Sequence, residues 1–180
     1  SKSIRPDTGF VCTGKLDIGR DEFSCWNKDG HGYVDLTKAI AWSCNVYFYH
    51  AGLLTGADKL SEYAGIFGLG KKTGIELFGE SSGFVPSKEW KKAVKKEVWY
   101  PGDTANFSIG QGDLLVTPLQ IARIVAAITN SGVLIQPHIL KRIGDRDAAN
   151  IQTENLKISK ENINALKFGM RLVVEDPDGT

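Results

Sequence analysis

The spacing of apolar residues along the chain predicts several helices, and the clearest of them covers residues 117–131. Thr117 and Gln120 have the spacing of a capping box, in which each side chain bonds the backbone N–H of the other residue. Pro118 suits the first helical position, and Gly132 suits the position after the end. One side of this helix is apolar and consists of Ile121, Ile124, Val125 and Ile128. Their spacing predicts that this side is buried.

Further helices follow from the same apolar spacing. They are expected over 36–42, 46–54, 58–67 and from Ser159 onward. Asp35 can cap the first of them, and Gly56 can end the second. The last helix has one apolar stripe, formed by Ile163, Leu166, Met170 and Val173.

The remaining segments predict a strand and irregular structure. Residues 133–143 have the composition of a strand, whereas residues 10–34, rich in Gly, Asp and Lys, predict an irregular hairpin-like excursion. Residues 88–97 hold five lysines around Trp90 and Val94. This pattern predicts an exposed amphipathic helix whose lysines extend into solvent, with anion binding as the alternative.

Composition limits the possible functions. The chain has 180 residues, 42% of them hydrophobic, which suits one globular domain. Its 22 basic and 21 acidic residues give a net charge of +1, which argues against nucleic acid as a partner. There is no apolar run of ~20 residues and no signal peptide at Ser1. Both ends interrupt turn-like segments, so we expect an internal piece of a longer protein.

The triplet Ser43-Cys44-Asn45 lies between two expected helices. A hydroxyl and a carboxamide separated by one residue project to the same side of a turn, where they can hold a proton relay over a neighbouring nucleophile. Alone the triplet is weak evidence for a catalytic site, because Asn45 can also serve as a helix cap.

Two other short motifs carry less information. Lys72-Thr73-Gly74 spells a motif that binds substrate carboxylate in serine acyl-transfer enzymes, but here it reads as a loop entering a short strand. We therefore predict that it has no catalytic role. The glycines in Ser108-Ile109-Gly110-Gln111-Gly112 indicate a tight turn or a close backbone approach, and the segment lacks the lysine of a phosphate loop.

Taken in order, the motifs resemble the class B penicillin-binding proteins, above all those of cell elongation. The order is His31-Gly32, Asp35-Leu36, Ser43-Cys44-Asn45, Tyr47-Phe48-Tyr49, Phe67-Gly68-Leu69-Gly70, Thr73-Gly74-Ile75-Glu76-Leu77, Pro86-Ser87-Lys88-Glu89-Trp90, Trp99-Tyr100-Pro101-Gly102-Asp103-Thr104, Ser108-Ile109-Gly110-Gln111-Gly112 and Thr117-Pro118-Leu119-Gln120. The likeness runs from about Asp7 to Thr180.

The resemblance implies a mixed α/β (α+β) fold of the serine transpeptidase and β-lactamase type, largely helical in this stretch. It implies a peptidoglycan D,D-transpeptidase, which cross-links D-Ala-D-Ala stem peptides through a serine acyl-enzyme and binds β-lactams. Ser43 would belong to the proton relay, and Asn45 would contact the lysine beside the nucleophile and the substrate amide. The implied location is the periplasmic face of the inner membrane, with a membrane-embedded glycosyltransferase as partner and no cofactor for catalysis.

The sequence lacks two motifs of the family. No serine is followed three residues later by lysine, so the nucleophile motif Ser-x-x-Lys is absent, and so is the final Lys-Ser/Thr-Gly motif in its expected place. We therefore expect residues 1–180 to be part of a single transpeptidase domain and to be inactive alone. The alternatives are a β-lactam sensor or a non-catalytic pseudoenzyme domain of the same fold. A β-lactamase is disfavoured, because no carboxylate stands at a recognisable position for activating water.

The three cysteines suggest a metal site. Cys12, Cys25 and Cys44, together with His31, form a Cys₃His set that is typical of structural zinc sites. If Ser43 and Asn45 face an active site, Cys44 must face the layer behind it. A Cys12–Cys25 disulfide and inert buried thiols are the alternatives.

Overall fold

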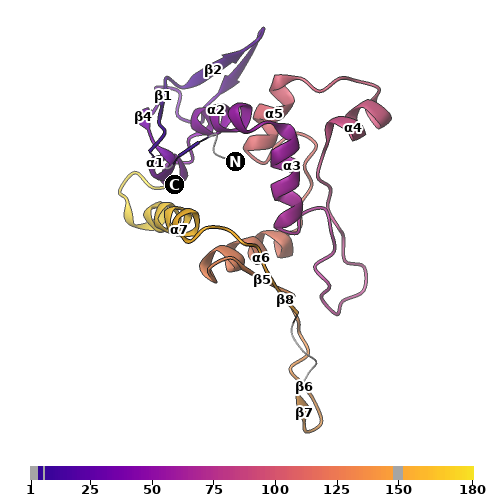
Figure 1. Cartoon of the computed structure of the whole chain (residues 1–180). Coiled ribbons are helices and arrows are strands. Elements are labelled where there is room, and N and C mark those ends of the chain that lie inside the picture. Colours follow the sequence, from indigo (N-terminus) through magenta and orange to yellow (C-terminus); the bar gives the residue numbers. More distant parts are fainter. Residues whose placement is uncertain (1–3, 6, 148–151) are drawn as a thin grey trace.

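The computed structural model describes residues 4–5, 7–147 and 152–180 (Figure 1). The helices are α1 (Leu36–Ala41), α2 (Asn45–Thr55), α3 (Ala57–Ile66), α4 (Lys88–Trp90), the π-helix η1 (Lys91–Lys95), α5 (Pro101–Ser108), α6 (Pro118–Thr129) and α7 (Lys160–Glu175). The strands are β1 (Phe10–Cys12), β2 (Lys15–Ile18), β3 (Asp21–Ser24), β4 (Gly32–Val34), β5 (Val133–Ile135), β6 (Arg142–Ile143), β7 (Arg146–Asp147) and β8 (Thr153–Asn155). They form four antiparallel pairs, namely β1–β4, β2–β3, β5–β8 and β6–β7.

The helices pack around two hydrophobic clusters. The first lies between α1, α2, α5 and the N-terminal strands, and it contains Cys12, Cys25, Val34, Ala39, Cys44, Val46, Tyr47, Tyr49 and Ala105. The second lies under α6 and the β5–β8 pair and contains Ala127, Leu134 and Leu156. Helix α7 packs on both α1 and α6, and the β6–β7 hairpin extends away from the helices (Figure 1). The expectation of a mixed, largely helical fold is confirmed.

Helix ends follow the capping residues that the sequence predicts. The Asp35 carboxylate accepts the Lys38 N–H at 2.9 Å. At α6, the Thr117 N–H donates to Gln120 Oε1 at 2.9 Å, and the Gln120 N–H donates to Thr117 Oγ1 at 3.1 Å, which is the predicted capping box. Ser159 caps α7 with a single bond, in which its hydroxyl accepts the Asn162 N–H at 3.2 Å.

The predicted buried stripe of α6 is wrong. Ile121 and Val125 are 45% and 40% exposed, whereas Gln120 is 2% exposed. The Gln120 amide donates to the carbonyl oxygens of Lys71 and Ser82, both at 2.8 Å. The buried side of α6 is therefore set by a polar side chain that joins two loops, which apolar spacing does not reveal.

The predicted strand over 133–143 is also too long. Strand β5 ends at Ile135, and the Gln136 N–H still donates to the Gln152 carbonyl at 2.9 Å. Pro137 follows and has no N–H to donate, so the ladder stops there.

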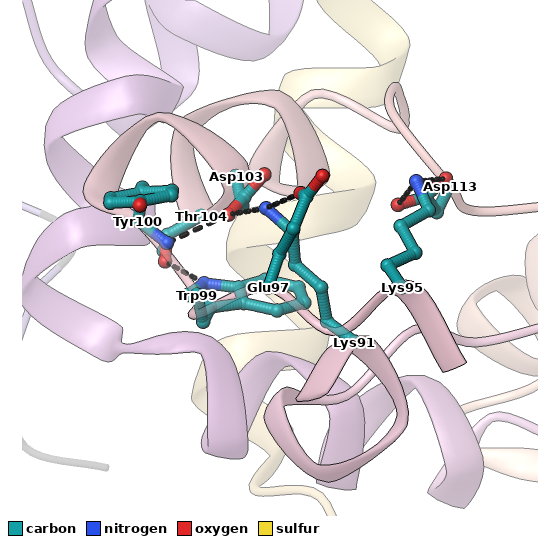
Figure 2. A network of polar contacts seen from close by, with 8 residues as sticks. All are labelled: Lys91, Lys95, Glu97, Trp99, Tyr100, Asp103, Thr104 and Asp113. Atoms are coloured by element: carbon teal, nitrogen blue, oxygen red, sulfur yellow. Dashed lines mark hydrogen bonds and ion pairs between the residues drawn. The ribbon is translucent and has the colours of Figure 1, made fainter. Parts of the chain in front are cut away.

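The lysine-rich segment differs from the exposed helix that we predict. It folds as α4 followed by η1, and Lys91 is 4% exposed. Lys91 Nζ lies 2.6 Å from Asp103 Oδ2 and 3.5 Å from Glu97 Oε2 (Figure 2). Burial opposes the charge, but the hydrogen bond and negative charge of Asp103 raise the pKa of Lys91.

Helix α5 has no counterpart among the predicted helices. Asp103 accepts the Tyr100 N–H at 2.7 Å, which caps the start of α5, and Pro101 occupies its first position. The Trp99 indole donates to Thr104 Oγ1 at 2.8 Å (Figure 2). The same rules that predict α6 therefore apply here and could have revealed α5. Within the described ranges, no helix is long and apolar enough to cross a membrane.

Candidate functional site

The Ser43-Cys44-Asn45 triplet forms a turn between α1 and α2. Ser43 is exposed and has φ of +49°, a left-handed conformation that is uncommon outside glycine. Asn45 is half-buried as the first residue of α2, whereas Cys44 is completely buried. The two polar side chains therefore lie outside the core, and the thiol lies inside it.

Asn45 is anchored by the end of strand β3. Its Nδ2 donates to the Ser24 carbonyl at 3.3 Å, and the Tyr49 hydroxyl donates to the same oxygen at 3.2 Å. The Phe23 ring packs edge-on against Tyr49, with ring centroids 5.6 Å apart. One backbone carbonyl thus fixes two side chains on the same side of α2, which limits the orientations of the Asn45 amide.

Behind the triplet, four potential metal ligands converge. The ligand atoms of Cys12, Cys25, His31 and Cys44 all lie within 4.8 Å of one another. Cys25 Sγ lies 3.6 Å from His31 Nδ1. Thiolates bind zinc at about 2.3 Å, so neighbouring sulfurs in a tetrahedral site are about 3.8 Å apart. The ligand atoms thus lie within about 1 Å of that spacing, and the composition of the cluster fits zinc.

Strand pairing brings these distant residues together. Cys12 pairs with Gly32 across β1 and β4, which places His31 beside the end of β1. The Cys25 N–H donates to the Gly14 carbonyl at 2.7 Å and so holds Cys25 next to the same strand. Cys44 enters from the turn before α2. All three cysteines are free, so the alternative Cys12–Cys25 disulfide is absent from the described part of the chain.

The surroundings of the cluster shift the pKa values of its residues in different directions. Burial raises the pKa of Cys44 to about 12. Burial also opposes ionisation of Cys25, but backbone N–H groups, led by that of Asn27, lower its pKa. Burial lowers the pKa of His31 and keeps the imidazole in its neutral, metal-binding form. Three buried thiolates need a cation beside them, and otherwise Cys44 stays a thiol.

The sequence matches the family described as the penicillin binding protein transpeptidase domain over residues 1–180. The chain belongs to this family. The curated peptidoglycan D,D-transpeptidase MrdA of Salmonella typhimurium is 44% identical over 139 residues, which are 76% of this chain and 22% of that protein. The chain thus spans about a fifth of the length of this relative.

Solved structures of penicillin-binding transpeptidases have the same fold. PBP2 of Pseudomonas aeruginosa, in complex with WCK 5153, is 32% identical with a TM-score of 0.91, over 99% of this chain and 41% of that one. PBP2 of Helicobacter pylori, in complex with MreC, is 35% identical with a TM-score of 0.87, over 98% of this chain and 32% of that one. These matches confirm the expected fold class and show that the chain is similar to PBP2.

For this penicillin-binding transpeptidase chain, Lys72-Thr73-Gly74 lies away from the candidate site. The Thr73 N–H donates to Glu80 Oε1 at 2.7 Å, and the Gly74 N–H donates to Glu80 Oε2 at 3.2 Å. The Thr73 hydrogen bonds, ahead of an opposing effect of burial, lower the pKa of Glu80. Lys72 and Thr73 line a hollow of about 570 Å³ whose lining includes neither Ser43 nor Asn45. The expected strand after Gly74 is a loop in the structure.

The glycine-rich segment of this transpeptidase chain turns as predicted. Gly110 and Gly112 have φ of +75° and +78°, conformations that favour glycine. The turn follows α5, which packs on α2. From the sequence we predict neither helix α5, which packs on α2, nor the bond from Tyr49 to the Ser24 carbonyl that also holds Asn45.

Proposed function

We propose that this chain is part of the transpeptidase domain of a peptidoglycan D,D-transpeptidase. In that reaction a serine hydroxyl attacks the D-Ala-D-Ala carbonyl, D-alanine leaves, and an ester joins the serine to the stem peptide. The amine of a neighbouring stem peptide then displaces the serine and completes the cross-link. The nucleophile and its lysine would come from residues other than 1–180 of the same domain, because this sequence has no Ser-x-x-Lys.

In this proposal Ser43 and Asn45 form the second catalytic motif. The Ser43 hydroxyl is exposed and can pass a proton between the nucleophile and the leaving amine. The Asn45 amide, oriented by the Ser24 carbonyl, can bond the lysine and the substrate amide. The observation that carries the proposal is the 43–45 turn, with two polar side chains outside and a buried residue between them, within a family match over the whole chain.

Penicillin labelling tests this function. We expect the intact protein that carries this chain to gain the mass of one penicillin on a Ser-x-x-Lys serine, and residues 1–180 alone to gain none. A stable adduct on residues 1–180 would contradict the assignment. An intact protein that is acylated but forms no cross-linked dimer from purified stem-peptide substrate would instead favour the β-lactam sensor.

We also propose that Cys12, Cys25, His31 and Cys44 hold a structural zinc ion. Bound zinc would supply the positive charge that stabilises three buried thiolates, and it would join β1, β3 and β4 to the turn before α2. Because Cys44 stands between Ser43 and Asn45, such a link would hold the catalytic turn in place. The convergence of the four ligand atoms within 4.8 Å supports this site.

Metal analysis of matched histidine variants tests the zinc site. We expect about one zinc per chain in the purified intact protein. His31→Asn should lower the zinc content and the melting temperature, whereas His138→Asn, at an exposed histidine, should change neither. Wild-type protein without zinc, or with a Cys12–Cys25 bridge by mass spectrometry, would contradict the proposal.

The partners follow from the same function. We propose that the intact protein acts at the periplasmic face of the inner membrane on peptidoglycan stem peptides and binds β-lactams. A membrane-embedded glycosyltransferase would supply the strands to be cross-linked. The solved complex of H. pylori PBP2 with MreC supports a multiprotein setting for such an enzyme.

A further inference from the structure

The segment after α7 returns to the turn that contains Ser43, as the position of the C-terminal label beside α1 in Figure 1 illustrates. The Thr180 N–H donates to the Ala41 carbonyl at 3.1 Å. The Trp42 indole donates to the Asp176 carboxylate at 3.4 Å, and the Gly179 N–H donates to the Asp176 carbonyl at 2.9 Å. Residues 176–180 are therefore tied to the end of α1 by both backbone and side-chain bonds.

Gly179 lets the chain come this close. A Cβ atom built on Gly179 would lie 2.4 Å from the Val173 carbonyl oxygen and 2.8 Å from that of Leu172. Real Cβ atoms do not approach backbone so closely, so only glycine fits without a shift of α7. The position of the next residue, Thr180, is thus set by packing against the last turn of α7.

The Thr180 hydroxyl bonds two partners at the Ser43 turn. Thr180 Oγ1 lies 2.5 Å from Ser43 Oγ and 3.3 Å from the Ala41 carbonyl oxygen. Across the Ser43–Thr180 contact either hydroxyl can donate, whereas toward Ala41 only Thr180 can, because a carbonyl only accepts. The two contacts fix the Ser43 oxygen relative to Thr180 and the end of α1.

We propose that Thr180 is a positioning residue for Ser43, an inference that rests on the proposed transpeptidase function. The contact with Thr180 holds the Ser43 hydroxyl in one rotamer and so gives the relay oxygen a fixed place. As Ser43 receives a proton from the side of the nucleophile, it releases its own proton toward the leaving amine. Within the described part of the chain, no other side chain bonds the Ser43 hydroxyl. Without Thr180 the Ser43 side chain is free to rotate, and in a fraction of molecules its oxygen would be out of reach of the relay.

The test compares variants of Thr180 in the intact protein that carries this chain. Thr180→Val keeps the shape and removes the hydroxyl, whereas Thr180→Ser keeps the hydroxyl. The second-order rate constant of acylation by a fluorescent penicillin is measured together with the melting temperature. We expect Thr180→Val to slow acylation by roughly tenfold, which corresponds to one lost hydrogen bond, and Thr180→Ser to stay near wild type.

Combination with Ser43→Ala shows whether Thr180 acts through Ser43. The double variant should acylate no more slowly than Ser43→Ala alone, since the loss of Ser43 leaves Thr180 nothing to position. Thr129→Val is the matched control, because the Thr129 hydroxyl bonds only backbone carbonyls of its own helix, and its acylation rate should not change.

Three results would overturn the inference while leaving the proposed function intact. They are wild-type acylation by Thr180→Val, multiplicative losses in the double variant, and a slow Thr180→Ser. If Thr180→Val does not fold, Thr180→Ala replaces it, and unfolding of both would assign the hydroxyl to the fold. Absence of wild-type acylation would overturn the proposed function and this inference with it.

Discussion

Neighbouring residues of the 43–45 turn have different environments, although only one peptide bond separates each pair. Ser43 is exposed, Cys44 is in the core beside the other thiols, and Asn45 begins α2 with its amide held by Ser24. The left-handed φ of Ser43 produces this alternation, because it reverses the chain between two helices. Such a conformation costs roughly 1–2 kcal/mol in a residue with a side chain, so packing on both sides must hold it.

The roles proposed for Ser43 and Asn45 lead to a quantitative prediction. In the intact protein, Ser43→Ala or Asn45→Ala should slow penicillin acylation by about 10²- to 10⁴-fold, the usual contribution of a positioned acid–base group. Thermal unfolding should change little for Ser43→Ala, since that side chain is exposed. Stopped-flow acylation and a melting curve measure the two quantities.

Lys72→Ala provides the control for this experiment. Lys72 belongs to the motif that we predict to be non-catalytic, and Thr73 beside it is held by Glu80 away from the candidate site. We expect an acylation rate within about twofold of wild type, as for other exposed substitutions away from the site. A loss as large as that of Ser43→Ala would assign a catalytic role to Lys72-Thr73-Gly74 after all.

At the scale of elements, α2 is supported by α5, and α5 is supported by the network of Figure 2. Asp103 caps α5 and also pairs with the buried Lys91, so the same carboxylate joins the π-helix to the start of α5. The spacing of the lysines in residues 88–97 predicts that they are exposed, because it describes only the residues of that one segment. The burial of Lys91 depends on a partner 12 residues away, which periodicity does not register.

The contact between α2 and α5 depends on Gly52. A Cβ atom on Gly52 would lie 2.3 Å from Ser108 Cβ, so Gly52→Ala should push the helices apart and lower the free energy of unfolding by about 1–3 kcal/mol. Gly65→Ala is a matched control in α3, where a Cβ meets nothing within 4 Å. The free energy of unfolding of Gly65→Ala should rise by about 0.5–1 kcal/mol, because alanine favours helices over glycine.

Urea unfolding of the intact protein measures both glycine variants. Acylation should slow in Gly52→Ala as well, because α2 carries Asn45. If Gly52→Ala were as stable as Gly65→Ala, the two helices would not be in the contact described here.

For the whole molecule, features that depend on neighbouring residues are predicted better from the sequence than features that depend on distant segments. Asp35 and Thr117 cap their helices as expected, because a cap depends on residues within one turn. The burial of Ile121 and Val125 was predicted wrongly, since what covers a helix face depends on distant segments. Chemical type alone predicts the four residues of the cysteine cluster, and the structure places them together. That zinc binds there stays a prediction.

The placement of Cys44 has a consequence for how relatives of this chain diverge. Cys44 faces the Cys12, Cys25 and His31 side chains and not the side of the turn that carries Ser43 and Asn45, so selection on position 44 should follow the cluster and not the reaction. Homologues should therefore change these four positions as a correlated group. In a homologue that has no thiol, imidazole or carboxylate at one of these positions, the other three should also lack a metal ligand. Ser43 and Asn45 should be kept in the same homologue. An alignment of homologues in which position 44 varies independently of the other three would show that the cluster is not a unit of evolution.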